Sequence, residues 1–149
     1  MKTQIDSNEL SRILQPLSED LKSKLFIETT YSINNRIPNT SPQLSYPDSY
    51  KCLAINTQES YMPILRNLTE KYSHLNAVEE FYQKIPDITA SPNISMIYSN
   101  WDKYNYSENT ELLFLSLMII STTDESIKRS RSYSKAVKPI ETELKRRRE

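Results

Sequence analysis

Glycine is absent from this chain of 149 residues, whereas average usage is about 7%. Loops that cradle phosphate groups need glycine, because its backbone adopts positive φ angles and lets a ligand approach closely. The sequence therefore excludes a Walker-type loop and a dinucleotide-binding fingerprint. Two-residue β-hairpin turns also depend on glycine, so a sheet built from tight hairpins is disfavoured.

Cysteine and histidine each occur once, as Cys52 and His74. A single cysteine excludes an intrachain disulfide, which fits a reducing compartment. A zinc site made of Cys and His needs about four such ligands, so we expect no metal site and no cofactor. A Cys52–His74 nucleophile pair can be written down, but the favoured interpretation is a packed thiol and a surface imidazole near a helix end.

A long apolar run is also missing. The most apolar stretch, Leu112–Ile120, has nine residues, and a helix needs roughly 20 to cross a bilayer. The first nine residues contain no apolar run of the kind found in a secretory signal. We therefore expect no membrane contact and a cytoplasmic location.

Leu112–Ile120 is the element around which we expect the chain to fold. All its residues except Ser116 are apolar, and an element without a polar face belongs inside a core. Leu, Met and Phe outnumber its β-branched residues, and Asn109 and Glu111 suit the start of a helix. The stretch predicts a central helix of about three turns, with a buried strand as the alternative. Thr122 and Glu125 stand at capping-box spacing and predict that another helix begins there.

The first third of the chain predicts a helix, a loop and a short extended segment. Asp6 or Ser7 can cap a helix whose apolar stripe reaches Leu25, with Pro16 either kinking it or opening a second helix. Leu25–Ile33 is rich in β-branched and aromatic residues and could be a strand, but we expect the helix to continue into it. Ile37–Ser49 is predicted to be a loop, and Tyr50–Ile55 a short strand or extended segment.

Three more helical faces follow. Asn56 and Asn76 each open a capping box ahead of an apolar stripe, and Ser91-Pro92 is typical of a third helix start. The last of these stripes includes Tyr98, Trp101 and Tyr104. The predicted fold is all-α, an irregular bundle of five or six helices around the central apolar helix. The alternative is an α/β fold with a short buried sheet.

The charges are unevenly distributed, although 19 basic and 19 acidic residues leave no net charge. Residues 1–127 carry 10 Lys/Arg and 16 Asp/Glu, a balance of −6, and residues 128–149 carry 9 and 3, a balance of +6. We interpret 1–127 as an acidic helical core domain. Residues 128–149 form a basic C-terminal helix or tail of the same domain, interrupted by Pro139.

The basic segment supplies nine candidate contact residues for nucleic acid or for a partner subunit: Lys128, Arg129, Arg131, Lys135, Lys138, Lys145, Arg146, Arg147 and Arg148. A helix with this charge can lie along phosphates, releasing one counterion for each phosphate neutralised. It can equally dock on an acidic protein surface, including the body of this same chain. The bland alternative is a solvated basic helix without a partner.

Trp101, Tyr104 and Tyr106 form a second candidate site, an aromatic protein interface, because Tyr and Trp are over-represented at interface hot spots. Together these features predict a small non-enzymatic binding or subunit protein. One alternative is a protein-binding adaptor or inhibitor that uses the Tyr/Trp patch. The other is a small enzyme with a carboxylate/Tyr cleft near Ile37–Ser49.

Overall fold

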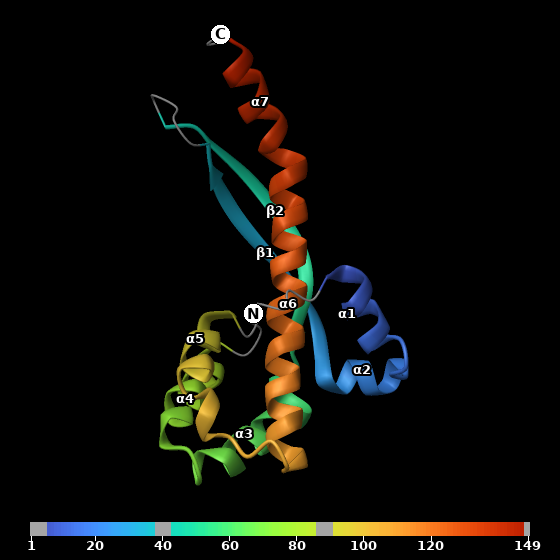
Figure 1. The fold of residues 1–149 in the computed structure, drawn as a ribbon, viewed down its shortest axis with the longest axis vertical. Coiled ribbons are helices and arrows are strands. Elements are labelled where there is room, and N and C mark those ends of the chain that lie inside the picture. Colours follow the sequence, from blue (N-terminus) through green and yellow to red (C-terminus); the bar gives the residue numbers. More distant parts are fainter. Residues whose placement is uncertain (1–5, 38–42, 86–90, 148–149) are drawn as a thin grey trace.

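The computed structural model describes residues 6–37, 43–85 and 91–147. The described chain is mostly helical, with one two-stranded antiparallel sheet (Figure 1). The α-helices are α1 (Ser7–Leu14), α2 (Glu19–Leu25), α3 (Met62–Thr69), α4 (Asn76–Lys84), α5 (Ser91–Ser99), α6 (Asn109–Ala136) and α7 (Lys138–Arg146). The strands are β1 (Phe26–Arg36) and β2 (Ser45–Ile55), and the short helical turns are η1 (Thr57–Tyr61), η2 (Ser73–Leu75) and η3 (Trp101–Lys103).

Helix α6 contains the central apolar stretch, so the prediction of a helix over Leu112–Ile120 is confirmed. The prediction of a new helix at Thr122 is wrong, because α6 runs without a break for 28 residues. The Thr122 hydroxyl donates to the carbonyl of Met118 at 2.8 Å, a bond made inside a helix rather than at its start. The helix is also not covered on every side, since Leu112 and Leu113 are 41% and 40% exposed.

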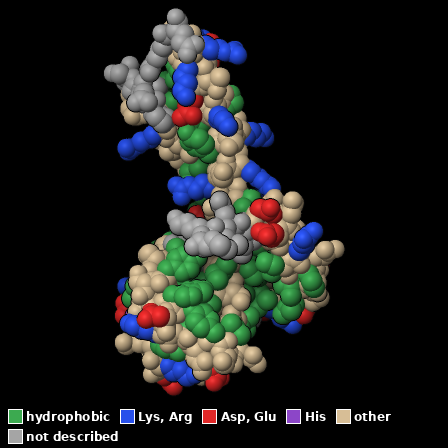
Figure 2. All heavy atoms as spheres, viewed as in Figure 1, with side chains coloured by type: hydrophobic (Ala, Val, Ile, Leu, Met, Phe, Trp, Pro, Cys, Tyr) green, Lys and Arg blue, Asp and Glu red, His purple; other side chains and the backbone are tan. Residues whose placement is uncertain are grey.

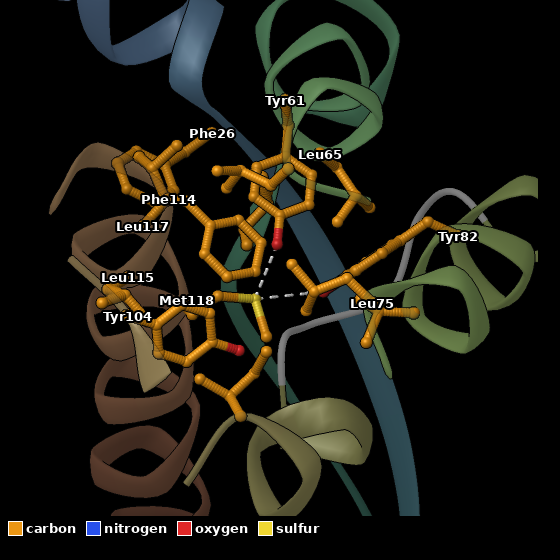
Figure 3. Packing of buried hydrophobic residues seen from close by; sticks show 14 residues of the cluster. Phe26, Tyr61, Leu65, Leu75, Tyr82, Tyr104, Phe114, Leu115, Leu117 and Met118 are labelled. Atoms are coloured by element: carbon orange, nitrogen blue, oxygen red, sulfur yellow. Dashed lines mark hydrogen bonds between the residues drawn. The ribbon is translucent and has the colours of Figure 1, made fainter. Parts of the chain in front are cut away.

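The core lies where the apolar half of α6 meets α3 and α4 (Figure 3). Phe114 of α6 stacks on Tyr61, with ring centroids 5.6 Å apart. The hydroxyl groups of Tyr61 and Tyr82 point to the sulfur of Met118, at 2.9 Å and 3.8 Å. These two buried hydroxyls thus share a thioether, a weak acceptor, at the centre of the cluster.

The long β-hairpin corrects the all-α prediction. We expected the first helix to continue into Leu25–Ile33 and Ile37–Ser49 to be a loop. Instead β1 and β2 pair over eleven residues each, from Phe26 opposite Ile55 to Arg36 opposite Ser45. The strand alternative for the first segment was the better one, since polar and less polar residues alternate along β1 with the period of two that a half-buried strand requires.

The register explains how a glycine-free chain with Pro47 in a strand forms this hairpin. Eight residues, 37–44, lie between the last strand pair, Arg36 and Ser45, so no two-residue turn is needed. The Ile37 N–H donates to the carbonyl of Leu44 at 2.9 Å. Hydrogen-bonded and non-hydrogen-bonded pairs alternate along an antiparallel ladder. By this alternation Pro47, opposite Asn34, occupies a position whose nitrogen points away from β1. Proline is tolerated there because no ladder donor is lost.

Helix α6 packs along β2 and supplies hydrogen bonds to its outer edge at Leu53. Leu53 pairs with Glu28 at a position where its N–H and C=O point away from β1. The Leu53 N–H donates to the Asp124 carboxylate at 2.7 Å, and its carbonyl accepts from the Ser121 hydroxyl at 2.8 Å. At the next residue of α6, Glu125, the carboxylate accepts from the Tyr50 hydroxyl of the same strand at 3.3 Å.

Most predicted helix boundaries are close to those observed, with two corrections. Asn56 caps η1 by accepting from the Gln58 N–H. Pro63 lies in the first turn of α3, and Pro139, which interrupts the basic segment, lies in the first turn of α7. Pro16 neither kinks a helix nor opens one: it lies between α1 and α2, and Ser18 caps the latter. Asn76 is not a cap, because α4 begins after Leu75 without a side-chain cap. No helix among the described residues is long and apolar enough to span a membrane.

Asp124→Ala tests the α6–β2 contact. The substitution leaves the Leu53 N–H without its acceptor and removes the partner of Lys128, whose Nζ lies 3.0 Å from Asp124. We expect the free energy of unfolding to fall by about 2–3 kcal/mol, the cost of an unsatisfied buried donor. Urea unfolding followed by circular dichroism measures it. The exposed Glu70→Ala is the control and should change stability by less than about 0.5 kcal/mol. Equal effects of the two substitutions would contradict this account of the edge.

Candidate functional site

The basic half of α6 and the whole of α7 extend beside the hairpin, away from α3, α4 and α5 (Figure 1). This region is the narrow part of the molecule, and Lys and Arg side chains project from it on several sides (Figure 2). The first half of α6 packs in the core, and the helix continues without a break into its basic half. The positions of the cations on α6 are therefore fixed relative to the core.

The predicted cations differ in how they are engaged. Lys128 is half-buried against Asp124, at 3.0 Å. Arg147 pairs with Glu143, also at 3.0 Å, and Arg148 lies outside the described residues. The six others are exposed and make no salt bridge within the described part of the chain: Arg129, Arg131, Lys135, Lys138, Lys145 and Arg146. These six residues are called the basic row below.

Three members of the basic row follow one another at helical spacing. Arg131 precedes Lys135 by four residues, and Lys138 follows three residues later, across the junction of α6 and α7. Residues three and four apart are neighbours on a helix surface. Arg131 and Lys135 are therefore neighbours on the surface of α6, and Lys138 follows at the start of α7, so a chain of phosphates can contact several of these charges together.

Two grooves run along α6. The first has a volume of about 670 Å³ and is lined by Asp6, Ser7, Tyr98, Ile119, Thr122, Thr123, Ser126, Ile127, Ser130 and Arg131. The second, of about 570 Å³, is lined by Asn35, Thr122, Glu125, Ser126, Arg129, Ser130 and Tyr133. They share Thr122, Ser126 and Ser130, which are spaced four residues apart and present a row of hydroxyl groups. An arginine stands at each groove.

The second groove also contains a buried donor. Asn35 of β1 lines it, and the Nδ2 of its side chain has no hydrogen-bond partner among the described residues. Glu125 is the acidic residue of this groove, but it is 7% exposed and accepts from Tyr50. The exposed lining is therefore rich in donors, which suits an anionic or polar ligand.

The three predicted aromatic interface residues do not share one surface. Tyr104 is 4% exposed and belongs to the core, where its hydroxyl lies 2.8 Å from Nε2 of His74. Trp101 and Tyr106 are 38% and 39% exposed, and their ring centroids lie 5.5 Å apart. A partner could therefore contact Trp101 and Tyr106, but not the buried ring of Tyr104.

Tyr98 takes the place of Tyr104 in the exposed group. It was expected on a buried helical face, yet it is 54% exposed, and its ring centroid lies 5.7 Å from that of Trp101. Tyr98, Trp101 and Tyr106 are called the aromatic cluster below. Sequence reasoning also missed Asn35 and the hydroxyl row. The only sequence signal for that row was the four-residue spacing of Thr122, Ser126 and Ser130.

The residues considered for catalysis are buried or engaged elsewhere. Cys52 is 1% exposed, and burial, with Glu125 and Asp124 nearby, raises the pKa of its thiol to about 12. The His74 ring contacts Tyr104 and Tyr72 rather than Cys52. Among the described residues no group of three or more His, Cys, Asp or Glu side chains could hold a metal ion.

His74→Gln tests the environment of the only histidine. Burial, and to a lesser extent Lys103, lowers the pKa of His74 below its usual 6.5. As the pH falls, the unfolded chain is therefore protonated at a higher pH than the folded chain. The stability that neutral His74 contributes is present above pH 6.5 and is lost as the pH falls below it. We expect the free energy of unfolding of the wild-type protein to drop more than that of the variant between roughly pH 7.5 and roughly pH 5.5. Parallel pH profiles from chemical denaturation would show that His74 is not responsible.

A scan against protein-family models found no match for this chain, and searches of curated proteins and of solved structures found none either.

Proposed function

We propose that this protein works by binding rather than by catalysis, and that the basic row on α6 and α7 contacts nucleic acid. The observation that carries the proposal is the exposure of six cations along one protruding helical segment, without a salt bridge among the described residues. Neutralising phosphates with such cations releases counterions and favours association.

The rest of the chain orients the contact. Residues 1–127 have a balance of −6 and repel a polyanion, whereas residues 128–149 have a balance of +6. Charge separated in this way directs the encounter to one part of the surface even when the net charge is zero. A nucleic acid should therefore lie along α6 and α7 and avoid the acidic helical body.

The lining of the grooves favours nucleic acid over a protein partner. Seven of the ten residues that line the first groove are polar or charged. The centre of a stable protein–protein interface is usually apolar and poor in charge. Hydroxyl groups beside arginine are instead typical of contacts to phosphate and sugar oxygens.

A triple variant, Arg131→Gln, Lys135→Gln and Lys138→Gln, tests the proposal. Fluorescence anisotropy with labelled DNA and RNA is measured over a salt series. The plot of log K against log salt concentration should become shallower by about 2–3, since each lost phosphate contact contributes about 0.7–0.9 to the slope.

The matched control removes three exposed cations within residues 1–127, by Lys51→Gln, Arg66→Gln and Lys84→Gln. It makes the same change in net charge. It should leave the salt slope close to that of the wild-type protein. Salt-insensitive binding by the wild-type protein, no binding at all, or an equal effect of both triple variants would contradict the proposed function.

A further inference from the structure

Tyr98 connects the aromatic cluster to the first groove. It is a member of the aromatic cluster, and it also lines the first groove, which contains Arg131 and the hydroxyl groups of Ser126 and Ser130. An exposed ring and an exposed cation thus face one groove of about 670 Å³. A ligand that fills this groove meets an aromatic surface and a positively charged one at once.

Within the aromatic cluster, the Tyr98 ring packs against that of Trp101. The Trp101 ring meets Tyr98 at an interplanar angle of 63° and Tyr106 at 48°. The Tyr106 hydroxyl donates to the backbone carbonyl of Trp101, which ties the η3 turn to the segment leading into α6. Tyr98 is the most exposed ring of the three, at 54%, so it is the ring best placed to stack on a ligand.

We propose that the first groove binds single-stranded nucleic acid, with a base stacked on Tyr98 and the adjoining phosphate held by Arg131 and the hydroxyl row. This inference rests on the proposed function and specifies its ligand. Stacking on aromatic side chains combined with a cationic groove is the usual way in which single strands are bound. In a duplex the base faces are already stacked on one another, so a duplex can use the basic row but not Tyr98.

Asp6 is the acidic residue in the lining of the first groove, and it is already engaged. Its carboxylate accepts the backbone N–H groups of Asn8 and Glu9 at 2.7 and 2.9 Å, as the cap of α1. These bonds direct its charge toward the start of α1. The phosphate is therefore expected beside Arg131.

The test uses Trp101, the only tryptophan of the protein, as an internal reporter. The full-length protein is titrated with an unlabelled oligothymidine and, separately, with a duplex of equal length. We expect the oligothymidine to bind more tightly and to quench Trp101 emission, because a base stacked on Tyr98 lies next to the indole. The duplex should leave the emission nearly unchanged.

Substitutions separate stacking from charge. Tyr98→Ala should weaken oligothymidine binding by about 5- to 150-fold, the range for losing one stacked base, with the salt slope unchanged. Tyr98→Phe keeps the ring and should bind like the wild-type protein. Leu112→Ala removes a side chain of similar exposure, 41%, at the start of α6, and should have no effect.

The outcomes distinguish this inference from the function on which it rests. Equal binding of single strands and duplexes, unchanged Trp101 emission and an unaffected Tyr98→Ala variant would overturn the stacking site and leave the basic row as the interface. No binding of either nucleic acid by the wild-type protein would overturn both. The emission measurement needs no substitution, so it decides the matter even if Tyr98→Ala folds poorly.

Discussion

The hydrogen bonds between α6 and the outer edge of β2 are the constraint on which the rest of the structure depends. A two-stranded hairpin is marginally stable by itself in water, and an open strand edge exposes unpaired backbone groups. Asp124 and Ser121 satisfy both backbone groups of Leu53 on that edge. β2 also covers Asp124, which is 4% exposed. The contact between β2 and α6 fixes the direction in which the polar half of α6 leaves the core.

The opposite end of α6 is anchored just as firmly. Glu111, in its first turn, is fully buried and accepts from the Tyr72 hydroxyl at 2.8 Å and from the backbone N–H of Asn105. A carboxylate in this position also interacts favourably with the helix N-terminus. Because the helix is continuous, this anchor and the apolar core at Phe114 and Met118 support Arg129, Arg131 and Lys135, which follow Met118 by about three to five turns.

The sequence predicted the elements whose local signals were unambiguous. An apolar run as dense as Leu112–Ile120 has few structural options, and Pro139 marks a helix junction through its own geometry. The hairpin was missed because the end of the N-terminal apolar stripe overlaps the alternation of Ile27, Thr29, Tyr31 and Ile33. The favoured helix was overridden by pairing with β2, a partner twenty or so residues away that no local pattern reveals.

The candidate site was predictable in its charges and not in its shape. A row of lysines and arginines is visible in any sequence, so the basic row could be proposed from composition. The exposure of Tyr98 and the burial of Tyr104 could not, because both fit the same helical face. The chain leaves α5 at Ser99 and turns through η3, which ends that periodicity and sends Tyr104 alone into the core.

Although the chain has no net charge, its fold presents a positively charged surface along the basic half of α6. The acidic residues of the basic half of α6, Asp124 and Glu125, are buried against β2, where each accepts a hydrogen bond. Arg129 and Arg131 lie on exposed sides of the same helix. A helix with these residues in solution would show both signs of charge together, and they would partly cancel. Packing on β2 turns one sign inward, so the surface potential that a polyanion meets is set by how the helix docks rather than by the net charge.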